Sequence, residues 1–196
     1  MENIILASSS PRRQEILKAM GIPFQVIMPN IDESSFYSRN PSELPEILAK
    51  AKVQAVVRSR PPKQVVPWVL GADTLVVMGN KVFGKPNDHQ EAFDFLNALQ
   101  GRSHQVITSL ALYNGRNHVT SVRTAATKVT FAPMSEQEIE WYIDTGDWHG
   151  AAGGYRIQGM ASCFISKIEG TNSCVVGLPI FELYDMLKEQ GYSIIS

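Results

Sequence analysis

The most constraining feature of this sequence is the stretch Trp68–Met78, which is strongly apolar but carries the polar pair Asp73–Thr74 near its middle. Such a run is typical of a buried β-strand. A carboxylate inside it costs free energy through lost hydration, unless it is paired, bound to a metal or placed at the end of the strand. Two interpretations are open: Asp73 accepts a backbone N–H at a strand end, or it is a metal ligand or general base. We favour the second, because Leu70 and Leu75 flank the pair closely.

The composition limits the class of protein and of partner. A length of 196 residues suits one large domain, or two small lobes around a shared cleft. Hydrophobic residues make up 44% and charged residues 19%, which is ordinary for a globular protein and argues against disorder. The net charge of -1 argues against a nucleic-acid polymer as partner, but a small anionic ligand needs only a local cluster of cations.

Neither a membrane segment nor a metal cluster of cysteine or histidine is expected. No apolar run approaches the roughly 20 residues that span a bilayer, and the apolar stretch at the N-terminus is too short for a secretion signal. We therefore expect a cytoplasmic protein. Cys163 and Cys174 lack CxxC spacing and are expected to be buried free thiols, and the histidines show no zinc-site spacing.

Alternating helix and strand signals predict an α/β fold. Helices are expected where a cap residue or proline precedes an apolar period, over Ser10–Gly21, Ser42–Arg58, Asp88–Gly101, Ser135–Gly146 and from Pro179 onward. Asp88 with Glu91, and Ser135 with Glu138, are spaced like capping boxes. The second of these helices is expected to bury one apolar face, formed by Leu44, Ile47, Leu48, Ala51, Ala55 and Val56. Strands are expected at Ile4–Ala7, Phe24–Met28, Trp68–Met78, His104–Tyr113, His118–Phe131 and Ser162–Ile168, with a loop between Arg58 and Pro67. The turn Asn114–Gly115 makes the two long strands a hairpin, so a mixed sheet is expected rather than a purely parallel one.

The junction between the first strand and the first helix has the composition of a phosphate site. Ser8, Ser9 and Ser10 precede Pro11, and Arg12 and Arg13 follow it. A helix N-terminus presents free N–H groups to an anion, and arginine binds phosphate oxygens in pairs. Two cations here oppose the helix dipole, which a purely structural helix would avoid. A serine cap followed by solvated arginines is the equally weighted alternative.

Other charged residues indicate a function only when they are considered together. Glu33 follows a strand together with Asp32 and could add oxygen ligands for Mg²⁺. Lys52 lies on the second predicted helix, and Lys85 lies between Gly84 and Pro86. Alone, each is most often a solvated surface charge. Together they supply cations for phosphates and carboxylates for a metal.

A glycine-rich segment, Gly153–Gly159, contains Gln158. The glycines permit a close backbone approach, and Gln158 carries both a donor and an acceptor, which can match the edge of a base. On its own, the segment would be interpreted as a loop with an exposed glutamine.

Taken together, these segments resemble the Maf family of nucleoside triphosphate pyrophosphatases. The matching pieces occur in the family's order and span nearly the whole chain: SSSPRRQEIL (8–17), GADTLVV (71–77), GKP (84–86), GGYRIQG (153–159) and VVGLPI (175–180). Short motifs match by chance when taken singly, whereas an ordered set is specific.

The resemblance implies a fold, a reaction and site residues. The fold would be a single Maf-like domain over residues 1–196, similar to ITPases, with an elongated mixed sheet, flanking helices and a central cleft between two lobes. A homodimer is possible. The reaction would be hydrolysis between the α and β phosphates with a divalent cation, Mg²⁺ or Mn²⁺. The catalytic carboxylate maps onto Asp73, which would also hold the metal with Glu33. The other positions of the cleft map onto Ser8, Arg13, Lys52 and Lys85.

Within this resemblance, three residues indicate which nucleotide base the enzyme prefers. Members that act on dTTP and UTP resemble this chain in having Arg12, Thr74 and Gln158. We therefore expect a dTTP/UTP pyrophosphatase. The alternatives are a pyrophosphatase of 7-methyl-GTP or another modified nucleotide, and a nucleotide-binding regulator of cell division.

The chain departs from the family pattern just before the glycine-rich segment. Asp147 stands where members often have Glu, and Ala151 stands where they often have Lys. The missing lysine removes one possible phosphate contact, which bears on rate and metal affinity more than on the class of reaction.

Overall fold

The computed structural model describes residues 1–36, 42–61 and 67–195. The chain divides into two compact units. Unit 1 comprises Met1–Asp73, Thr108–Ala125 and Gly177–Ser196, and unit 2 comprises Thr74–Ile107 and Ala126–Val176. The predicted single domain is thus built of two units, and its predicted elongated shape and central cleft stay predictions.

The described strands form one seven-stranded mixed sheet, which confirms the predicted α/β class. Its order is β2-β1-β3-β5-β6-β7, with β4 paired to β3. β1 runs parallel to β2 and β3, whereas β4 is antiparallel to β3 and β7 to β6. The bounds are β1 Ile4–Leu6, β2 Phe24–Val26, β3 Trp68–Met78, β4 Lys81–Phe83, β5 Ser103–Asn114, β6 Val119–Phe131 and β7 Ile165–Glu169.

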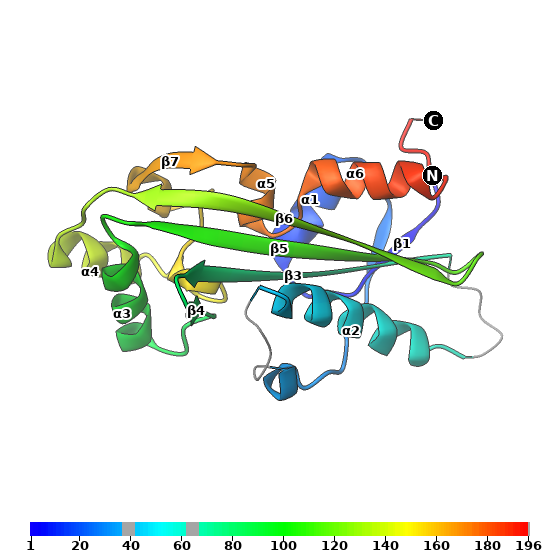
Figure 1. Ribbon diagram of the computed structural model, residues 1–196, viewed down its shortest axis with the longest axis horizontal. Helices are drawn as coiled ribbons and strands as arrows, with labels where there is room; N and C mark the ends of the chain where they lie inside the picture. Colours follow the sequence, from blue (N-terminus) through cyan, green and yellow to red (C-terminus); the bar gives the residue numbers. More distant parts are fainter. Residues whose placement is uncertain (37–41, 62–66, 196) are drawn as a thin grey trace. The chain divides into compact units, whose positions relative to one another are not determined.

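In unit 1, helices cover both faces of the strands. The helices are α1 (Pro11–Ala19), α2 (Leu44–Arg58) and α6 (Ile180–Glu189), and Figure 1 shows α1 and α6 on the opposite side of the sheet from α2. Successive side chains of a strand point to opposite faces. Trp68 and Leu70 accordingly pack in the cluster that contains α1 and α6 residues, and Val69 packs with the α2 residues.

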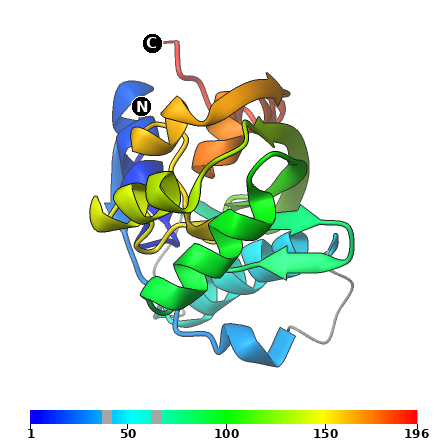
Figure 2. The same ribbon diagram turned by 90° about the vertical axis from the view of Figure 1, so that its left-hand side faces the viewer.

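Unit 2 has its own hydrophobic core. Its helices α3 (His89–Leu99) and α4 (Glu136–Asp144) pack against each other, as Figure 2 shows in green and yellow-green. Their apolar faces cover the core side of the strands in this unit. Buried strand residues of this core include Val76, Phe83, Val106, Val129 and Phe131. Short helices complete the unit: η2 Ala152–Gly154, η3 Met160–Cys163 and α5 Asn172–Val176.

The predicted helix starts agree with the structure to within two residues, and the bonds that cap the helices differ from one helix to the next. Ser135 and Glu138 form the expected reciprocal capping box at α4. Asp88 caps α3 by accepting from the Glu91 N–H, while the Glu91 carboxylate accepts from Asn87 N–H instead of completing the box. The Ser10 side chain makes no capping bond, although Pro11 does occupy the first helical position.

Other sequence predictions were wrong. The strand predicted at Ser162–Ile168 begins later, because η3 runs through Cys163 and β7 spans Ile165–Glu169. β4, α5 and the 3₁₀ helix η1 (Glu33–Phe36) were not predicted. Cys174 is buried as expected, but Cys163 is exposed. Most of the predicted loop between Arg58 and Pro67 lies outside the described residues.

The buried face of α2 was predicted only in part. Leu44, Leu48 and Val56 are buried as expected, whereas Ile47, Ala51 and Ala55 are only half-buried. Ala49 and Val53 are buried instead, and they bring Lys52 into the buried face with them.

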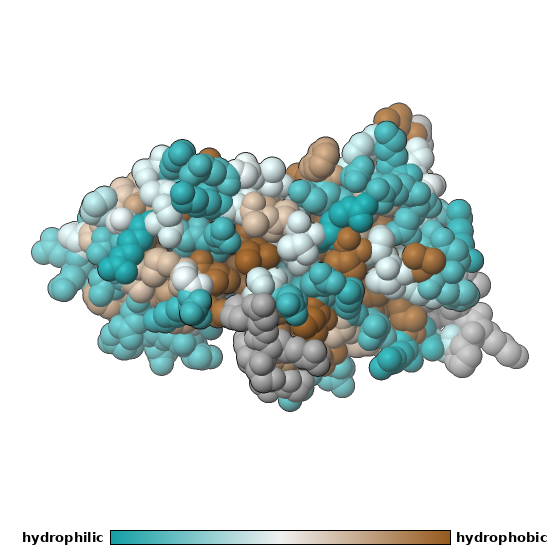
Figure 3. Space-filling model, viewed as in Figure 1, coloured by the Kyte–Doolittle hydropathy of each residue, from teal (hydrophilic) through white to brown (hydrophobic). Residues whose placement is uncertain are grey.

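The surface carries no extended apolar region on the face shown in Figure 3, where hydrophobic patches are small and separated by hydrophilic side chains. Within the described ranges, every helix is too short or too polar to cross a bilayer.

Candidate active site

A buried ion cluster surrounds Asp73 in unit 1. The Lys52 Nζ lies 2.6 Å from Asp73 Oδ1 and 2.8 Å from Glu33 Oε1. The side chains of Lys52 and Asp73 are only 8% and 10% exposed, whereas Glu33 is 39% exposed. The structure therefore brings together three predicted site residues from α2, η1 and β3, and Asp73 is paired rather than orphaned.

Gly71 explains how a helix comes so close to the strand at this point. A Cβ built on Gly71 would lie 2.6 Å from the Ala49 backbone oxygen and 2.8 Å from a methyl carbon of Val53. Both residues belong to α2 and flank Lys52 in space. A side chain at position 71 would push α2 away from β3, so the glycine permits the contact between Lys52 and Asp73.

Burial and neighbouring positive charges have opposite effects on the pKa of Asp73. Burial raises the pKa of the Asp73 carboxyl above its usual range, while the charge and hydrogen bond of Lys52, and the charge of Arg13, act to lower it. The net direction is upward. A carboxylate with a raised pKa is a better proton acceptor near neutral pH than an ordinary aspartate.

Arg13 is buried at the start of α1 and has structural partners. Its Nη1 donates to Ser8 Oγ at 2.8 Å, and its Nε donates to the Gly177 carbonyl at 2.8 Å. Ser8 Oγ also accepts the Ser10 N–H at 3.3 Å. These bonds give a structural reason for a cation in the first helical turn, and they connect two of the sequence motifs, residues 8–17 and 175–180. Burial lowers the pKa of Arg13 and the Asp73 charge opposes it, and an arginine remains charged in any case.

In unit 2, the Gly84–Pro86 segment meets the glycine-rich segment. Gly153 N–H donates to the Gly84 carbonyl at 2.8 Å, and a Cβ on Gly154 would lie 3.5 Å from the Pro86 ring. Gly153 has φ +72°, and a Cβ there would lie 2.9 Å from a methyl carbon of Val76. Glycine is thus required at position 153 by both backbone conformation and space.

A buried pair holds the next residue of this segment. Tyr155 Oη and His104 Nε2 are 2.7 Å apart, and both side chains are buried. Burial lowers the pKa of His104 to about 4 and raises that of Tyr155. No local pattern predicted this pair, since His104 and Tyr155 lie 51 residues apart and only Tyr155 belongs to a recognised motif.

The remaining predicted site residues are distributed between the units. In unit 1, Arg12 is half-buried, and its charge acts to lower the pKa of Arg13. Thr74 follows Asp73 in β3, begins unit 2 and is half-buried. Lys85 and Gln158 are exposed residues of unit 2. The structure therefore assembles Ser8 with Arg13, and Lys52 with Glu33 and Asp73, while the roles of all these residues stay predictions.

The carboxylates of Asp73 and Glu33 form a limited metal-binding set. Across the described part of the chain, no group of three or more His, Cys, Asp or Glu side chains is placed to hold a metal ion. Two carboxylates that converge on one ammonium nevertheless form a site that holds a cation. This donor set fits Mg²⁺, which is commonly held by one or two carboxylates while phosphates and water complete its shell.

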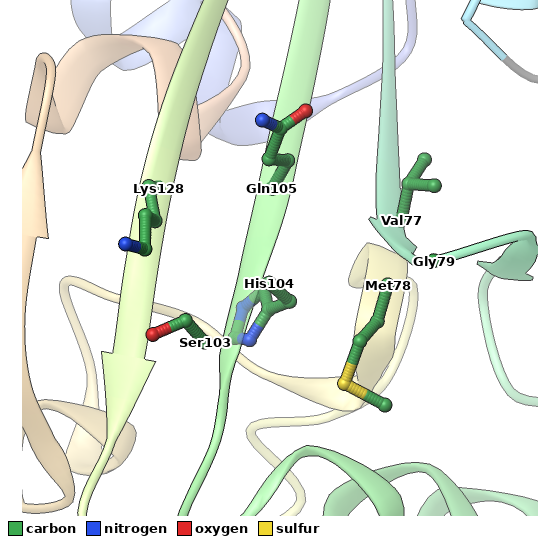
Figure 4. A pocket seen from close by; sticks show the side chains of 7 residues that line it. All are labelled: Val77, Met78, Gly79, Ser103, His104, Gln105 and Lys128. Carbon is green, nitrogen blue, oxygen red and sulfur yellow. The ribbon is translucent and has the colours of Figure 1, made fainter.

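A separate hollow of about 470 Å³ lies on unit 2 (Figure 4). Its lining comes from β3, the turn after it, β5 and β6: Val77, Met78, Gly79, Ser103, His104, Gln105 and Lys128. None of the predicted site residues lines it, so it does not coincide with the candidate active site.

The comparison with known proteins accounts for the ordered motifs. The sequence pattern of the Maf-like protein family matches residues 3–190. This chain belongs to the Maf-like protein family. The match is continuous across both units, so it includes the ion cluster around Asp73 and the segment around Gln158.

Two curated relatives of this Maf-like protein are similar along their whole length, and both are named dTTP/UTP pyrophosphatase. The protein from Symbiobacterium thermophilum is 46% identical over 100% of this chain and 98% of its own. That from Desulforamulus reducens is 43% identical over 100% of both chains. Among solved structures, the Staphylococcus aureus Ham1 protein matches with a TM-score of 0.45 and 15% identity over 67% of this chain and 72% of its own, a likeness too low to inform function.

Proposed function

We propose that this Maf-like protein hydrolyses dTTP and UTP to the nucleoside monophosphate and pyrophosphate. The observation that carries the proposal is the cluster of Lys52, Asp73 and Glu33, in which Lys52 and Asp73 are buried. It lies in a chain that is 46% and 43% identical to relatives named dTTP/UTP pyrophosphatase.

Asp73 serves as the general base. It accepts a proton from the water whose oxygen bonds to the α-phosphorus, while the bond from that phosphorus to the α–β bridging oxygen breaks and pyrophosphate leaves. The raised pKa of the Asp73 carboxyl supports this role, because proton transfer is most effective when the pKa of the base is near the working pH.

The positive charges of Lys52 and Arg13 offset part of the negative charge of the triphosphate. Lys52 is held beside Asp73 and supplies positive charge next to the base. Arg13 is held by Ser8 and the Gly177 carbonyl, and its positive charge acts on the same carboxylate. Ser8 and Lys85 complete the proposed phosphate contacts.

A divalent cation, Mg²⁺ or Mn²⁺, is the proposed cofactor. Asp73 and Glu33 would hold it, because their carboxylates converge on one cation position. When bound, it would polarise a phosphoryl oxygen and stabilise the charge that develops on the phosphates. Lys52 must then share these carboxylates with the metal.

Base selection is assigned to Gln158, supported by Arg12 and Thr74. Phosphates are common to all nucleotides, so phosphate contacts cannot select a base. The exposed amide of Gln158 offers one donor and one acceptor to the ring N3–H and carbonyl of uracil or thymine.

A homodimer and a cytoplasmic location are also proposed. Phe181 and Ile180 on α6 are 70% and 40% exposed and are the proposed contact residues of the dimer. Sedimentation at several protein concentrations tests the dimer, and a single monomeric species would contradict it.

The experiment is a nucleotide panel. The purified chain is supplied with Mg²⁺ or Mn²⁺ and with dTTP, UTP, CTP, ATP, GTP or 7-methyl-GTP, and both products are identified. We expect monophosphate and pyrophosphate, with dTTP and UTP hydrolysed fastest.

Three outcomes would contradict the proposal. Orthophosphate plus a diphosphate means that cleavage occurs at another bond. Preference for 7-methyl-GTP assigns the chain to the other pyrophosphatase class. Binding without turnover under every metal condition favours a nucleotide-binding regulator.

A further inference from the structure

Gln158 lies in a closed turn of unit 2. The Gly159 N–H donates to the Arg156 carbonyl at 3.0 Å, which places Ile157 and Gln158 at the centre of the turn. The Ile157 side chain is buried at 6% exposure, whereas Gln158 is exposed. The turn is therefore anchored on the core by one central residue and presents the other outward.

Asp147 contacts both ends of this turn. Its Oδ1 lies 3.6 Å from Arg156 Nη1, and its Oδ2 accepts the Met160 N–H at 3.0 Å. The Asp147 side chain is only 26% exposed, so these contacts are partly shielded from water. One carboxylate thus fixes the residue that opens the turn and the residue that follows its end.

Asp147 and its partner Arg156 are themselves held by further hydrogen bonds. The Asp147 N–H donates to Thr145 Oγ1 at 3.2 Å, just after α4 ends. Arg156 Nη2 donates to the His149 carbonyl at 2.8 Å, and the Arg156 N–H donates to Tyr142 Oη at 3.2 Å. The turn is therefore connected to α4 and the segment that follows it, and Asp147 provides the link that reaches both of its ends.

Gly159 leaves the space that the carboxylate occupies. A Cβ built on Gly159 would lie 2.2 Å from Asp147 Oδ2 and 3.1 Å from Asp147 Cγ. The φ of Gly159 is −107°, a value that any residue adopts, so backbone conformation does not require glycine here. The glycine is explained by the position of Asp147.

We propose that Asp147 is a positioning residue that holds Gln158 in the orientation needed to recognise the base. This inference rests on the proposed function and deepens it, because it adds a residue that determines base preference without touching the nucleotide. A hydrogen bond selects a base only if its donor is held in place, since an unfixed amide loses rotamer entropy on binding. Asp147 restrains the backbone of the turn that carries Gln158, so less conformational freedom of the turn is lost when the amide meets the base.

The test is a double-mutant cycle on base preference. The kcat/KM values for UTP and ATP are measured for the unaltered chain, Asp147→Ala, Gln158→Ala and the double variant. We expect each single variant to lower the UTP-to-ATP ratio about tenfold, as for one lost hydrogen bond. We expect the double variant to be no worse than Gln158→Ala, because Asp147 acts through Gln158.

A variant that adds a side chain next to Asp147 tests independently whether base preference depends on Asp147. Gly159→Ala should displace the Asp147 carboxylate and lower the ratio to a similar extent. In the Asp147→Ala background the same change meets no carboxylate and should have no further effect. Asp144→Ala, at an exposed aspartate at the end of α4, is the matched control and should leave the ratio unchanged. If Asp147→Ala does not fold, Asp147→Asn replaces it, since it removes the charge facing Arg156 but keeps an acceptor for Met160.

The outcomes separate this inference from the proposed function. If the unaltered chain prefers UTP and dTTP but Asp147→Ala keeps the ratio, or lowers kcat/KM equally for all nucleotides, only the role of Asp147 is overturned. Additive losses in the double variant overturn it as well. If the unaltered chain shows no preference for uracil or thymine, both the proposed function and this inference fail. Faster hydrogen exchange at the Met160 amide in Asp147→Ala is expected in every case. Unchanged exchange would contradict the contact between the Asp147 carboxylate and the Met160 N–H.

Discussion

The ammonium of Lys52 lies 2.6 Å from a carboxylate oxygen of Asp73, and α2 reaches this strand only because position 71 carries no side chain. The same ammonium lies 2.8 Å from Glu33. One cation is therefore shared by two carboxylates in a largely buried place, where removing one partner is costlier than at the surface. Stability and the proposed catalysis depend on the same contact.

Replacement of Lys52 by methionine should affect both properties. Asp73 and Glu33 would face each other without the cation, so the free energy of unfolding should fall by about 3 kcal/mol. The pKa of Asp73 should rise further, because Lys52 lowers it, and the acid limb of the kcat/KM profile should move to higher pH. Urea unfolding and pH–rate profiles measure these effects.

Lys50→Met is the matched control for this prediction. Lys50 lies on the same helix, is 44% exposed and pairs with Glu46 four residues earlier. Such surface pairs contribute only about 0.5 kcal/mol. Equal effects of the two lysine variants would show that the Asp73 cluster has no special role.

Asp73→Asn should abolish most turnover while the fold persists. The amide keeps the shape of the side chain, and Lys52 keeps Glu33 as a partner. Loss of a general base costs a factor of about 10² to 10⁴ in rate. Pyrophosphate release and circular dichroism are measured together, with Asp144→Asn as control. Full activity would remove Asp73 from the proposed mechanism, and a collapsed spectrum would assign it a structural role.

Gly71→Ala should separate α2 from β3. The added Cβ meets the Ala49 carbonyl and Val53, and overpacking of this kind costs about 1–3 kcal/mol. Turnover should fall with stability, because Lys52 moves away from Asp73. Gly84→Ala is the control for stability, since a Cβ there meets nothing within 4 Å. A Gly71→Ala variant as stable as the unaltered chain would show that α2 can shift without loss.

Stability should decrease on acidification through His104. Its folded pKa of about 4 lies below the ordinary 6.5, so the unfolded chain binds the proton more readily between these values. This contribution is fully present above about pH 6.5 and is lost as the pH falls toward 4, by on the order of 3 kcal/mol. Urea unfolding at pH 7, 5.5 and 4.5 measures it.

His104→Gln should flatten that part of the profile, because glutamine does not titrate. The exposed His89 provides the control His89→Gln, which should preserve the slope. An unchanged slope in His104→Gln would assign the acid sensitivity to other groups.

Local sequence patterns were sufficient for several elements of this protein. The strand Trp68–Met78, the capping box of Ser135 with Glu138 and the hairpin strands around Asn114–Gly115 were all predicted from neighbours a few residues apart. These features depend on backbone geometry and on hydrogen bonds within one or two turns, which short patterns encode. The motif order likewise indicated the family, which the match over residues 3–190 confirms.

The partners of the site residues were decided only by the tertiary structure. Lys52 meets Asp73 across 21 residues, and Arg13 meets the Gly177 carbonyl across 164. The apolar period of α2 correctly placed Leu48 on the buried face but also placed Ile47 there, which is only half-buried. It did not include Lys52 in that face, whereas packing against Gly71 buries Lys52. A helical period is compatible with several neighbouring faces, and the choice depends on the shape of the surface that the helix meets. That surface is made by residues distant in the chain, so it exists only once the sheet has formed.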